Sequence, residues 1–141
     1  MSDPGTDDEV TTAVDGALAD ARLILPAQPR SLRLARLTAS SLAADLDWSV
    51  DDIDDLRIAV DELCAAVIAS ASEDATLDLT FRRESEALLI EGVCEGGEGV
   101  VRLDPFAKEM LNLTTEGFEV DSDGPTRRFR LEKRPTGQDD A

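Results

Sequence analysis

Two segments of the sequence bring together residue types that a ligand-binding site needs. Glu62 carries a carboxylate near the edge of an apolar stripe of helical periodicity, with Ala66 one helical turn further on. The run Glu95-Gly96-Gly97-Glu98-Gly99 follows an apolar segment, and its glycines allow the backbone to turn and to approach a ligand closely. The two segments predict a site between a helix and the end of a strand. Each also has a simpler interpretation, as a solvated helix residue and as a polar exit from a strand.

The absence of one residue type and the scarcity of another exclude several kinds of chemistry. The chain has no histidine, which excludes a Ser-His-Asp triad, a His-ligated zinc and a phosphorylated histidine. The two cysteines, Cys64 and Cys94, lie 30 positions apart in apolar periodic segments. This placement predicts two buried, reduced thiols and makes a metal site at these residues a poor interpretation.

The charge balance limits the partners of the chain. Its 141 residues are the length of one domain, and its formal net charge is −17, from 14 Lys and Arg against 31 Asp and Glu. This imbalance argues against duplex DNA and against an anionic membrane surface as partners. No apolar run reaches the ~20 residues of a membrane span, and the acidic first residues do not resemble a signal peptide. We therefore expect a cytoplasmic protein whose partner is another protein.

Hydrophobic periodicity predicts the elements that position these residues. In chain order they are a strand at 22–25, a helix at 29–45, a long helix capped by Ser49, strands at 76–81 and 87–93, a short helix to 113 with Asp104 at its N-cap, and a strand pair at 116–120 and 126–133. The apolar positions of the first helix are Leu34, Leu37, Leu42 and Leu46, and those of the long helix are Ile53, Leu56, Val60, Leu63 and Val67.

This order predicts an α+β fold, a two-layer α/β sandwich with helices on one face of an antiparallel-rich mixed sheet. The acidic segments 1–21 and 135–141 contain too little apolar surface to fold, so we expect two disordered tails around a domain at 22–134.

Charged side chains on the two long helices are candidate partner-binding residues. They are Asp51, Asp54 and Asp55, together with Asp61 and Glu62, on the long helix, and Arg30, Arg33 and Arg36 on the first. The acidic face suits a basic partner, and it can equally be a solvated face that keeps the protein soluble. Trp48, the only Trp, lies between the helices and is either a core residue or an interface anchor.

The segment 52–66 and the order of elements resemble the bacterial anti-sigma-factor serine kinases of the histidine kinase-like ATPase (GHKL) family. The resemblance covers roughly residues 22–134. It implies a nucleotide site for ATP and Mg²⁺ beneath a flexible lid, sequestration of a sigma factor, and serine phosphorylation of an anti-anti-sigma protein. By the family's motifs, Glu62 matches the catalytic Glu of Glu-x-x-x-Asn, and Glu95, Gly97 and Gly99 match the adenine-binding Asp-x-Gly-x-Gly.

The chain departs from the family pattern at three places. Ala66 stands where the family has the Asn that holds Mg²⁺, and a methyl group cannot ligate a hard cation. Glu95 replaces the Asp, so its carboxylate reaches one methylene further. No glycine lies between Val100 and Thr115, where the family has its lid.

These departures predict a degenerate member of the family. We expect an anti-sigma-like regulator with a vestigial ATP site that acts in bacterial transcription control. Its partner would be a sigma factor or an anti-anti-sigma protein, and a homodimer is compatible with the family. We expect no tightly bound cofactor, with ATP and Mg²⁺ binding weak at most. The alternative is an active ATP-dependent serine/threonine kinase that uses Glu62 and a rebuilt pocket at Glu95, Gly97 and Gly99.

Overall fold

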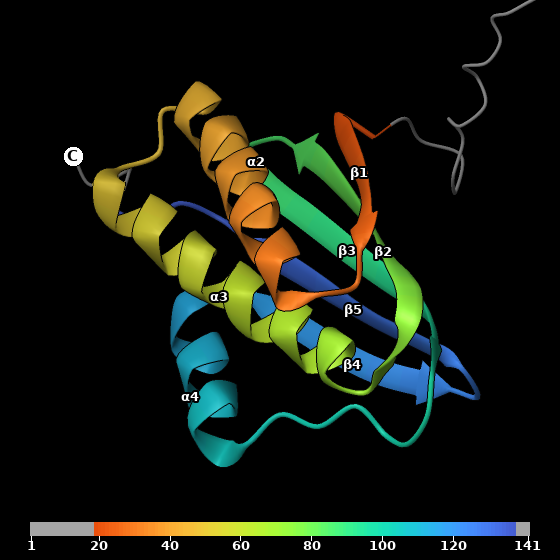
Figure 1. The fold of residues 1–141 in the computed structure, drawn as a ribbon. Helices are drawn as coiled ribbons and strands as arrows, with labels where there is room; N and C mark the ends of the chain where they lie inside the picture. Colours follow the sequence, from red (N-terminus) through yellow and green to blue (C-terminus); the bar gives the residue numbers. More distant parts are fainter. Residues whose placement is uncertain (1–18, 138–141) are drawn as a thin grey trace, which may run out of the picture.

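The computed structural model describes residues 19–137, which form a helical layer packed on one sheet (Figure 1). In chain order the elements are β1 (Ala21–Pro26), the short 3₁₀ helix η3 (Pro29–Ser31), α2 (Leu32–Asp45), α3 (Val50–Ala69), β2 (Ala71–Glu84), β3 (Ala87–Gly97), α4 (Pro105–Thr114), β4 (Gly117–Asp123) and β5 (Thr126–Lys133). This arrangement confirms the predicted two-layer α+β fold.

The sheet has five strands in the order β1-β2-β3-β5-β4, and every neighbouring pair is antiparallel. The prediction of a mixed sheet was therefore wrong. Strands β2 and β3, and likewise β4 and β5, follow each other directly in the sequence, whereas β1 and β2 are joined through α2 and α3. Strands β3 and β5 are neighbours although α4 and β4 lie between them in the sequence, and β4 is at the edge of the sheet.

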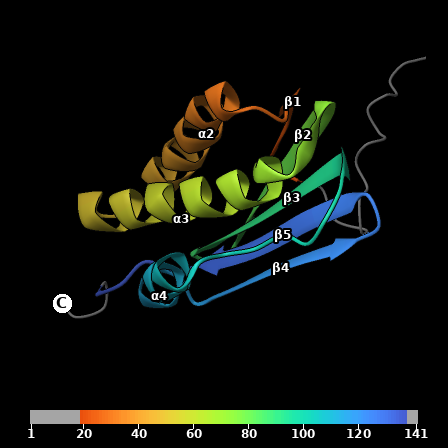
Figure 2. The same ribbon diagram turned by 60° about the horizontal axis from the view of Figure 1, so that its bottom comes forward.

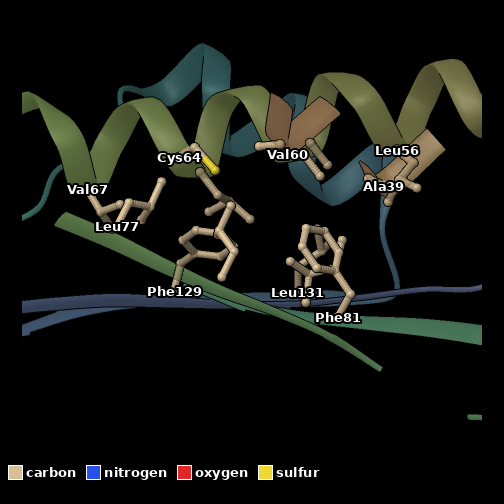
Figure 3. Packing of buried hydrophobic residues seen from close by; sticks show 14 of the residues in the cluster. Ala39, Leu56, Val60, Cys64, Val67, Leu77, Phe81, Phe129 and Leu131 are labelled. Atoms are coloured by element: carbon tan, nitrogen blue, oxygen red, sulfur yellow. The ribbon is translucent and has the colours of Figure 1, made fainter. Parts of the chain in front are cut away.

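The helices α2, α3 and α4 lie on the same face of the sheet, and no helix formed by residues 19–137 covers the opposite face (Figure 2). The core lies between the two layers. In the close-up, Leu56, Val60 and Cys64 of α3 point toward Phe129 and Leu131 of β5 (Figure 3). The predicted stripe of α3 is confirmed as its buried face, with Ile53 only partly buried. Within the described residues, no helix is long and apolar enough to cross a bilayer.

Helix α2 buries a different face from the one its leucines predict. Its buried residues are the small ones, Ala35, Ala39 and Ala43, which are fully inaccessible to solvent. Leu34 and Leu37 are instead 44 % and 53 % exposed. Small side chains let α2 lie close to α3 and the sheet, because a helix axis approaches its neighbours according to the side chains at the contact. Leu34 and Leu37 are thereby turned outward, whereas Leu42 and Leu46 are half-buried and pack against the core, as predicted.

The ends of the domain extend slightly beyond the predicted boundaries. Asp20 accepts hydrogen bonds from the backbone and side chain of Arg83, and Thr136 donates two hydrogen bonds to Asp52. The rest of the predicted tails, residues 1–18 and 138–141, lies outside the described residues.

A buried polar network fixes the N-terminal end of α3. The Ser49 side chain accepts a hydrogen bond from the Asp52 backbone N–H and caps the helix as predicted. Asp52 is only 1 % exposed, and its carboxylate accepts hydrogen bonds from Ser49 Oγ and from the backbone and side chain of Thr136. Lys133 Nζ lies 3.9 Å from Asp52 Oδ1 and donates to the carbonyl of Thr114 at 2.8 Å. One carboxylate thus connects α3 to the end of β5, and its cationic neighbour connects β5 to α4.

Removing this carboxylate should strongly destabilise the fold. In Asp52→Ala, buried Lys133 would keep its charge without a counterion, and we expect a loss of about 3 kcal/mol of unfolding free energy. Buried Trp48 provides the fluorescence signal for urea denaturation. Asp51→Ala, at the exposed neighbouring position, is the matched control and should stay within about 0.5 kcal/mol of wild type. Equal stability of the two variants would contradict this account of the network.

The same network predicts a pH dependence. Burial raises the pKa of Asp52, but the hydrogen bonds from Thr136 and Ser49 and the charge of Lys133 outweigh burial, so the pKa lies below its ordinary value. A lowered folded-state pKa stabilises the fold fully above the unfolded value of about 3.9, and this contribution is lost as pH falls through the folded value. The stability difference between wild type and Asp52→Asn should therefore be constant from pH 7 to about 5 and shrink below about pH 4. A difference that grows on acidification would refute the assignment.

Candidate functional site

One face of α3 and the end of the central strands form the candidate site. Glu62, Ala66 and Ser70 follow one another at intervals of four along α3 and its C-cap, so they lie along one side of the helix. Glu62 and Ala66 are half-buried, and Ala66 packs against the core. Along this side the helix therefore carries a carboxylate, then a methyl group, then a hydroxyl at its C-cap.

The strand alternation at the end of β3 separates two neighbouring residues. Cys94 shares the helix-facing side of the strand with Leu88 and Ile90 and is fully buried. Glu95 faces the opposite, open side of the sheet, where its Oε1 accepts a hydrogen bond from Thr126 Oγ1 at 2.9 Å. A predicted nucleotide contact from Glu95 requires it to point toward α3. The structure corrects that expectation, because the inward position belongs to the thiol of Cys94.

Arg127 occupies the space where the predicted site residues converge. It pairs with Cys94 across β3 and β5, faces the helices, and is completely buried. Its Nε donates to Ser70 Oγ at 2.8 Å, and its Nη2 donates to the carbonyl oxygens of Glu98 and Gly99. The guanidinium thus joins the C-terminal end of α3 to the glycine turn.

The glycine turn is shaped around this guanidinium. Gly96, Gly97 and Gly99 all have positive φ, and the turn is held by Glu98 N–H donating to the Ser70 carbonyl at 3.2 Å. A Cβ on Gly97 would lie 2.5 Å from the Ser70 carbonyl oxygen and 2.9 Å from Arg127 Nε. Gly97, which was predicted to let a ligand approach, therefore allows an internal arginine to approach.

The electrostatics of this site are those of a buried cation among neutral groups. The acceptors of the Arg127 guanidinium are a hydroxyl and two backbone carbonyls, and its Nη1 is buried with no hydrogen-bond partner in the part of the chain that the structure describes. Burial raises the pKa of the Cys94 thiol, which the charge of Arg127 opposes in part. The thiol therefore does not supply a counter-charge. Both cysteines are free and buried, as the sequence predicted.

These residues do not fit a magnesium-bound nucleotide. Mg²⁺ takes oxygen ligands, and Ala66 offers none at the position the family uses. An adenine amino group needs an acceptor, whereas Cys94 and the donor-only guanidinium of Arg127 face that side of the sheet. Among residues 19–137, no three His, Cys, Asp or Glu side chains are grouped so that they could hold a metal ion.

The segment after the turn is short. Residues 98–104 lead directly into α4, whose first turn is capped by Asp104 Oδ1 accepting from Ala107 N–H at 2.7 Å, as predicted. Val101 in this segment is buried and its N–H donates to Ser122 Oγ. The connection is therefore tied to the sheet along part of its length.

The predicted partner-binding residues are divided between the surface and the interior. Asp51, Asp54, Arg30 and Arg33 are exposed, whereas Asp55 is partly buried. Arg36 forms an ion pair with Asp61 at 2.7 Å between α2 and α3, so this part of the basic ridge is used within the fold. Trp48 is 6 % exposed and its Nε1 donates to the carbonyl of Glu86. Of the two interpretations that the sequence left open for Trp48, the structure supports the core residue, because the ring is buried.

Arg127 and Cys94 are the important residues of this site that the motif analysis missed. A signal for both was present in the strand alternation. Arg127 has the same parity as Phe129 and Leu131, and Cys94 has the same parity as Ile90. Two adjacent arginines are easily taken for a surface pair, but only Arg128 faces solvent.

The comparisons with a family model and with known proteins agree on one family. Residues 25–136 match the model of the histidine kinase-like ATPase domain. The anti-sigma-F factor RsbW of Mycobacterium tuberculosis is 30 % identical over 104 residues, covering 72 % of this chain and 61 % of the relative. The serine-protein kinase RsbW of Bacillus subtilis is 37 % identical over 59 residues (41 % and 37 %), and that of Bacillus velezensis is 40 % identical over 50 residues (36 % and 31 %). The matched segments thus span 31 to 61 % of the length of these relatives.

The close contact at the glycine turn predicts a position-specific cost. Gly97→Ala places a methyl group against the Ser70 carbonyl and the Arg127 side chain, and we expect it to lower the unfolding free energy by about 2 kcal/mol or more. Gly99 also has positive φ but has open space around it, so Gly99→Ala should cost only about 1 kcal/mol from backbone strain. Urea denaturation measures both. A smaller cost at Gly97 than at Gly99 would show that the turn is not packed around Arg127.

Proposed function

Because the chain belongs to the histidine kinase-like ATPase family, we propose that it is a regulatory protein of the anti-sigma type with a vestigial nucleotide site. It acts by binding a protein partner in the control of bacterial transcription, inside the cytoplasm. Phosphoryl transfer depends on positioning and on metal ions that neutralise the developing charge. A chain without the metal ligand would retain the scaffold and its surfaces but not this chemistry.

The position of Arg127 is the observation that carries the proposal. Its buried guanidinium fills the turn at Gly97 and Gly99 and bonds to Ser70 at the end of the α3 face that bears Glu62 and Ala66. A nucleotide bound there would have to displace this side chain and break its hydrogen bonds to the turn. The proposed loss of nucleotide binding would therefore have an internal structural cause in addition to the missing metal ligand.

The names of the relatives support the choice of partner. One relative is an anti-sigma-F factor and others are serine-protein kinases. We propose that the partner here is a sigma factor or an anti-anti-sigma protein, and that the acidic residues Asp51 and Asp54 of α3 contribute to the surface that binds it. A homodimer is part of the same proposal, since it would present two copies of each surface.

The second candidate function is an active serine/threonine kinase. The kinase names of the Bacillus relatives favour it, and so does the partial exposure of Glu62, which leaves its carboxylate accessible on α3. In this case ATP and Mg²⁺ would occupy a pocket opened by movement of Arg127, with Gly97 and Gly99 beside the nucleotide. Glu95 would have to act from the open face of the sheet or not at all.

Calorimetric titration of the full chain with ATP and Mg²⁺ tests the two candidates against each other. The vestigial site predicts no binding heat at millimolar nucleotide, with or without the metal. Micromolar binding that requires Mg²⁺ and is lost in Glu62→Ala would overturn the proposal and establish the kinase candidate. Glu98→Ala is the control, because this exposed side chain lies beside the site and its backbone carbonyl remains.

A further inference from the structure

We propose that the outer edge of β4 binds a basic, extended segment of another protein, which joins the sheet as an additional strand. The segment would hydrogen-bond to the backbone of β4 and place positively charged side chains over the open face of the sheet, which is the face away from the helices. This inference goes beyond the proposed function and does not depend on it, because it involves neither the nucleotide site nor the acidic residues of α3.

The outer edge of β4 has free backbone groups. β4 (Gly117–Asp123) is the last strand in the order β1-β2-β3-β5-β4, with β5 on its inner side (Figure 1). Among residues 19–137, no backbone hydrogen bond joins this strand to any segment other than β5. Near its end, Val101 N–H donates to the Ser122 side chain at 3.4 Å, which leaves the edge backbone unused. An added strand satisfies such unpaired N–H and C=O groups.

The two faces of β4 specify the kind of strand that fits. Phe118 and Val120 are half-buried and pack against the core from the helix side. The alternate positions therefore point to the open face, and all of them are exposed. They are Gly117, Glu119, Asp121 and Asp123. A segment that alternates apolar and basic residues complements both faces, because side chains directly opposite each other on neighbouring strands interact.

The negative charge of this edge is not fully neutralised within the fold. Arg130 of β5 lies opposite Glu119, but its Nε pairs with Glu91 of β3 at 3.1 Å. Asp121 pairs with Arg128 at 3.2 Å. Glu119 forms no ion pair with any residue between 19 and 137. A carboxylate near the middle of the edge strand is thus available to a cation on an added strand.

A hollow beside Glu119 offers room for the side chain that carries this cation. Its volume is about 280 Å³, and all its lining residues belong to β3, β4 and β5, so it lies on the open face. Gly117 leaves it unfilled, since a Cβ there would meet no atom within 4 Å. Small-molecule sites have volumes of about 300–1,000 Å³, so this smaller hollow suits one side chain. Its carboxylates, from Glu91, Glu119 and Glu132, outnumber the guanidinium of Arg130, which selects Lys or Arg.

The opposite edge of the sheet lacks these features and serves as the comparison. The side chains of β1 on the open face include Arg22, which pairs with Asp78 of β2 at 2.7 Å, and Ile24, which is exposed. The strand ends at Pro26, which has no N–H to donate to a partner. The β1 edge therefore has neither a free carboxylate nor a complete set of backbone donors.

A second copy of this chain does not complement the β4 edge. Antiparallel pairing of two β4 strands would bring the acidic row of one copy beside the same row of the other, and like charges opposite each other are destabilising. Charged side chains on edge strands are a common protection against self-pairing. The charge of β4 therefore disfavours self-association and favours a basic partner strand.

Amide chemical shifts of the isotope-labelled full chain test the proposal with a designed probe. The probe is the blocked peptide Thr-Arg-Val-Arg-Val-Arg-Thr, and the control peptide has the same composition with its arginines adjacent to one another. At physiological ionic strength we expect saturable shifts at 117–121, with residues 21–26 of β1 unaffected. The control peptide should bind about fivefold more weakly or less, because it has the charge but not the alternation.

Matched variants test the charge and the hollow separately. Glu119→Lys should weaken binding of the probe about fivefold or more, since an attractive cross-strand pair becomes repulsive. Gly117→Leu should weaken it to a similar extent without changing charge, because the new side chain fills the hollow. Glu109→Lys makes the same charge change at an exposed position of α4 and should alter the affinity by less than about twofold, since distant surface charges are screened.

Methylation of the probe backbone separates strand addition from simple charge attraction. N-methyl groups on one set of alternate residues should abolish binding, because they block the N–H groups that face β4, whereas methylation of the other set should not. Equal effects of the two sets, shifts at 50–55 of α3 instead of 117–121, or an unchanged affinity in Glu119→Lys would overturn the proposal. Dimerisation of the chain through 117–121 without the probe would assign the edge to a second copy and would also overturn it.

Discussion

Strand β5 carries two buried cationic side chains, and their hydrogen bonds and ion pair hold α3 over the sheet. Arg127 hydrogen-bonds at the C-terminal end of α3, and Lys133 lies beside Asp52 at the N-terminal end. Both side chains face the helical layer because they share the parity of Phe129 and Leu131. A buried charge is costly unless it is paired or hydrogen-bonded, so the turn, the helix ends and α4 are constrained to the positions where these partners meet.

The two ends of α3 satisfy their cations in different ways, and this difference connects the fold to the proposed function. At Asp52 a carboxylate neutralises the cation and accepts hydrogen bonds from two hydroxyls and a backbone N–H. At Arg127 the acceptors are neutral and one nitrogen has no partner among the described residues. Two carbonyl groups of the glycine turn are consequently hydrogen-bonded to an internal side chain. In the proposed function, the exposed acidic surface of α3 would then be the part of the domain that binds another protein.

Most of the architecture could be predicted from local patterns, whereas the site could not. The stripe of α3, the caps at Ser49 and Asp104 and the paired strands follow from periodicity and cap chemistry. The face of α2 could not be predicted, because leucines and alanines both fit a helical period and only the close approach to α3 selects the small residues. Glu95 was misplaced because a motif read along the chain ignores strand parity, which sends neighbours to opposite faces. Trp48 was left open, since composition alone does not decide between core and interface.

A crystal structure of the chain soaked with an adenine nucleotide and Mg²⁺ tests the central claim most directly. The account predicts that the guanidinium of Arg127 stays between Ser70 and the carbonyls of Glu98 and Gly99, with no nucleotide along the Glu62–Ala66 face of α3. An ordered triphosphate bridged by a metal ion beside Ala66, with Arg127 displaced from the turn, would contradict it.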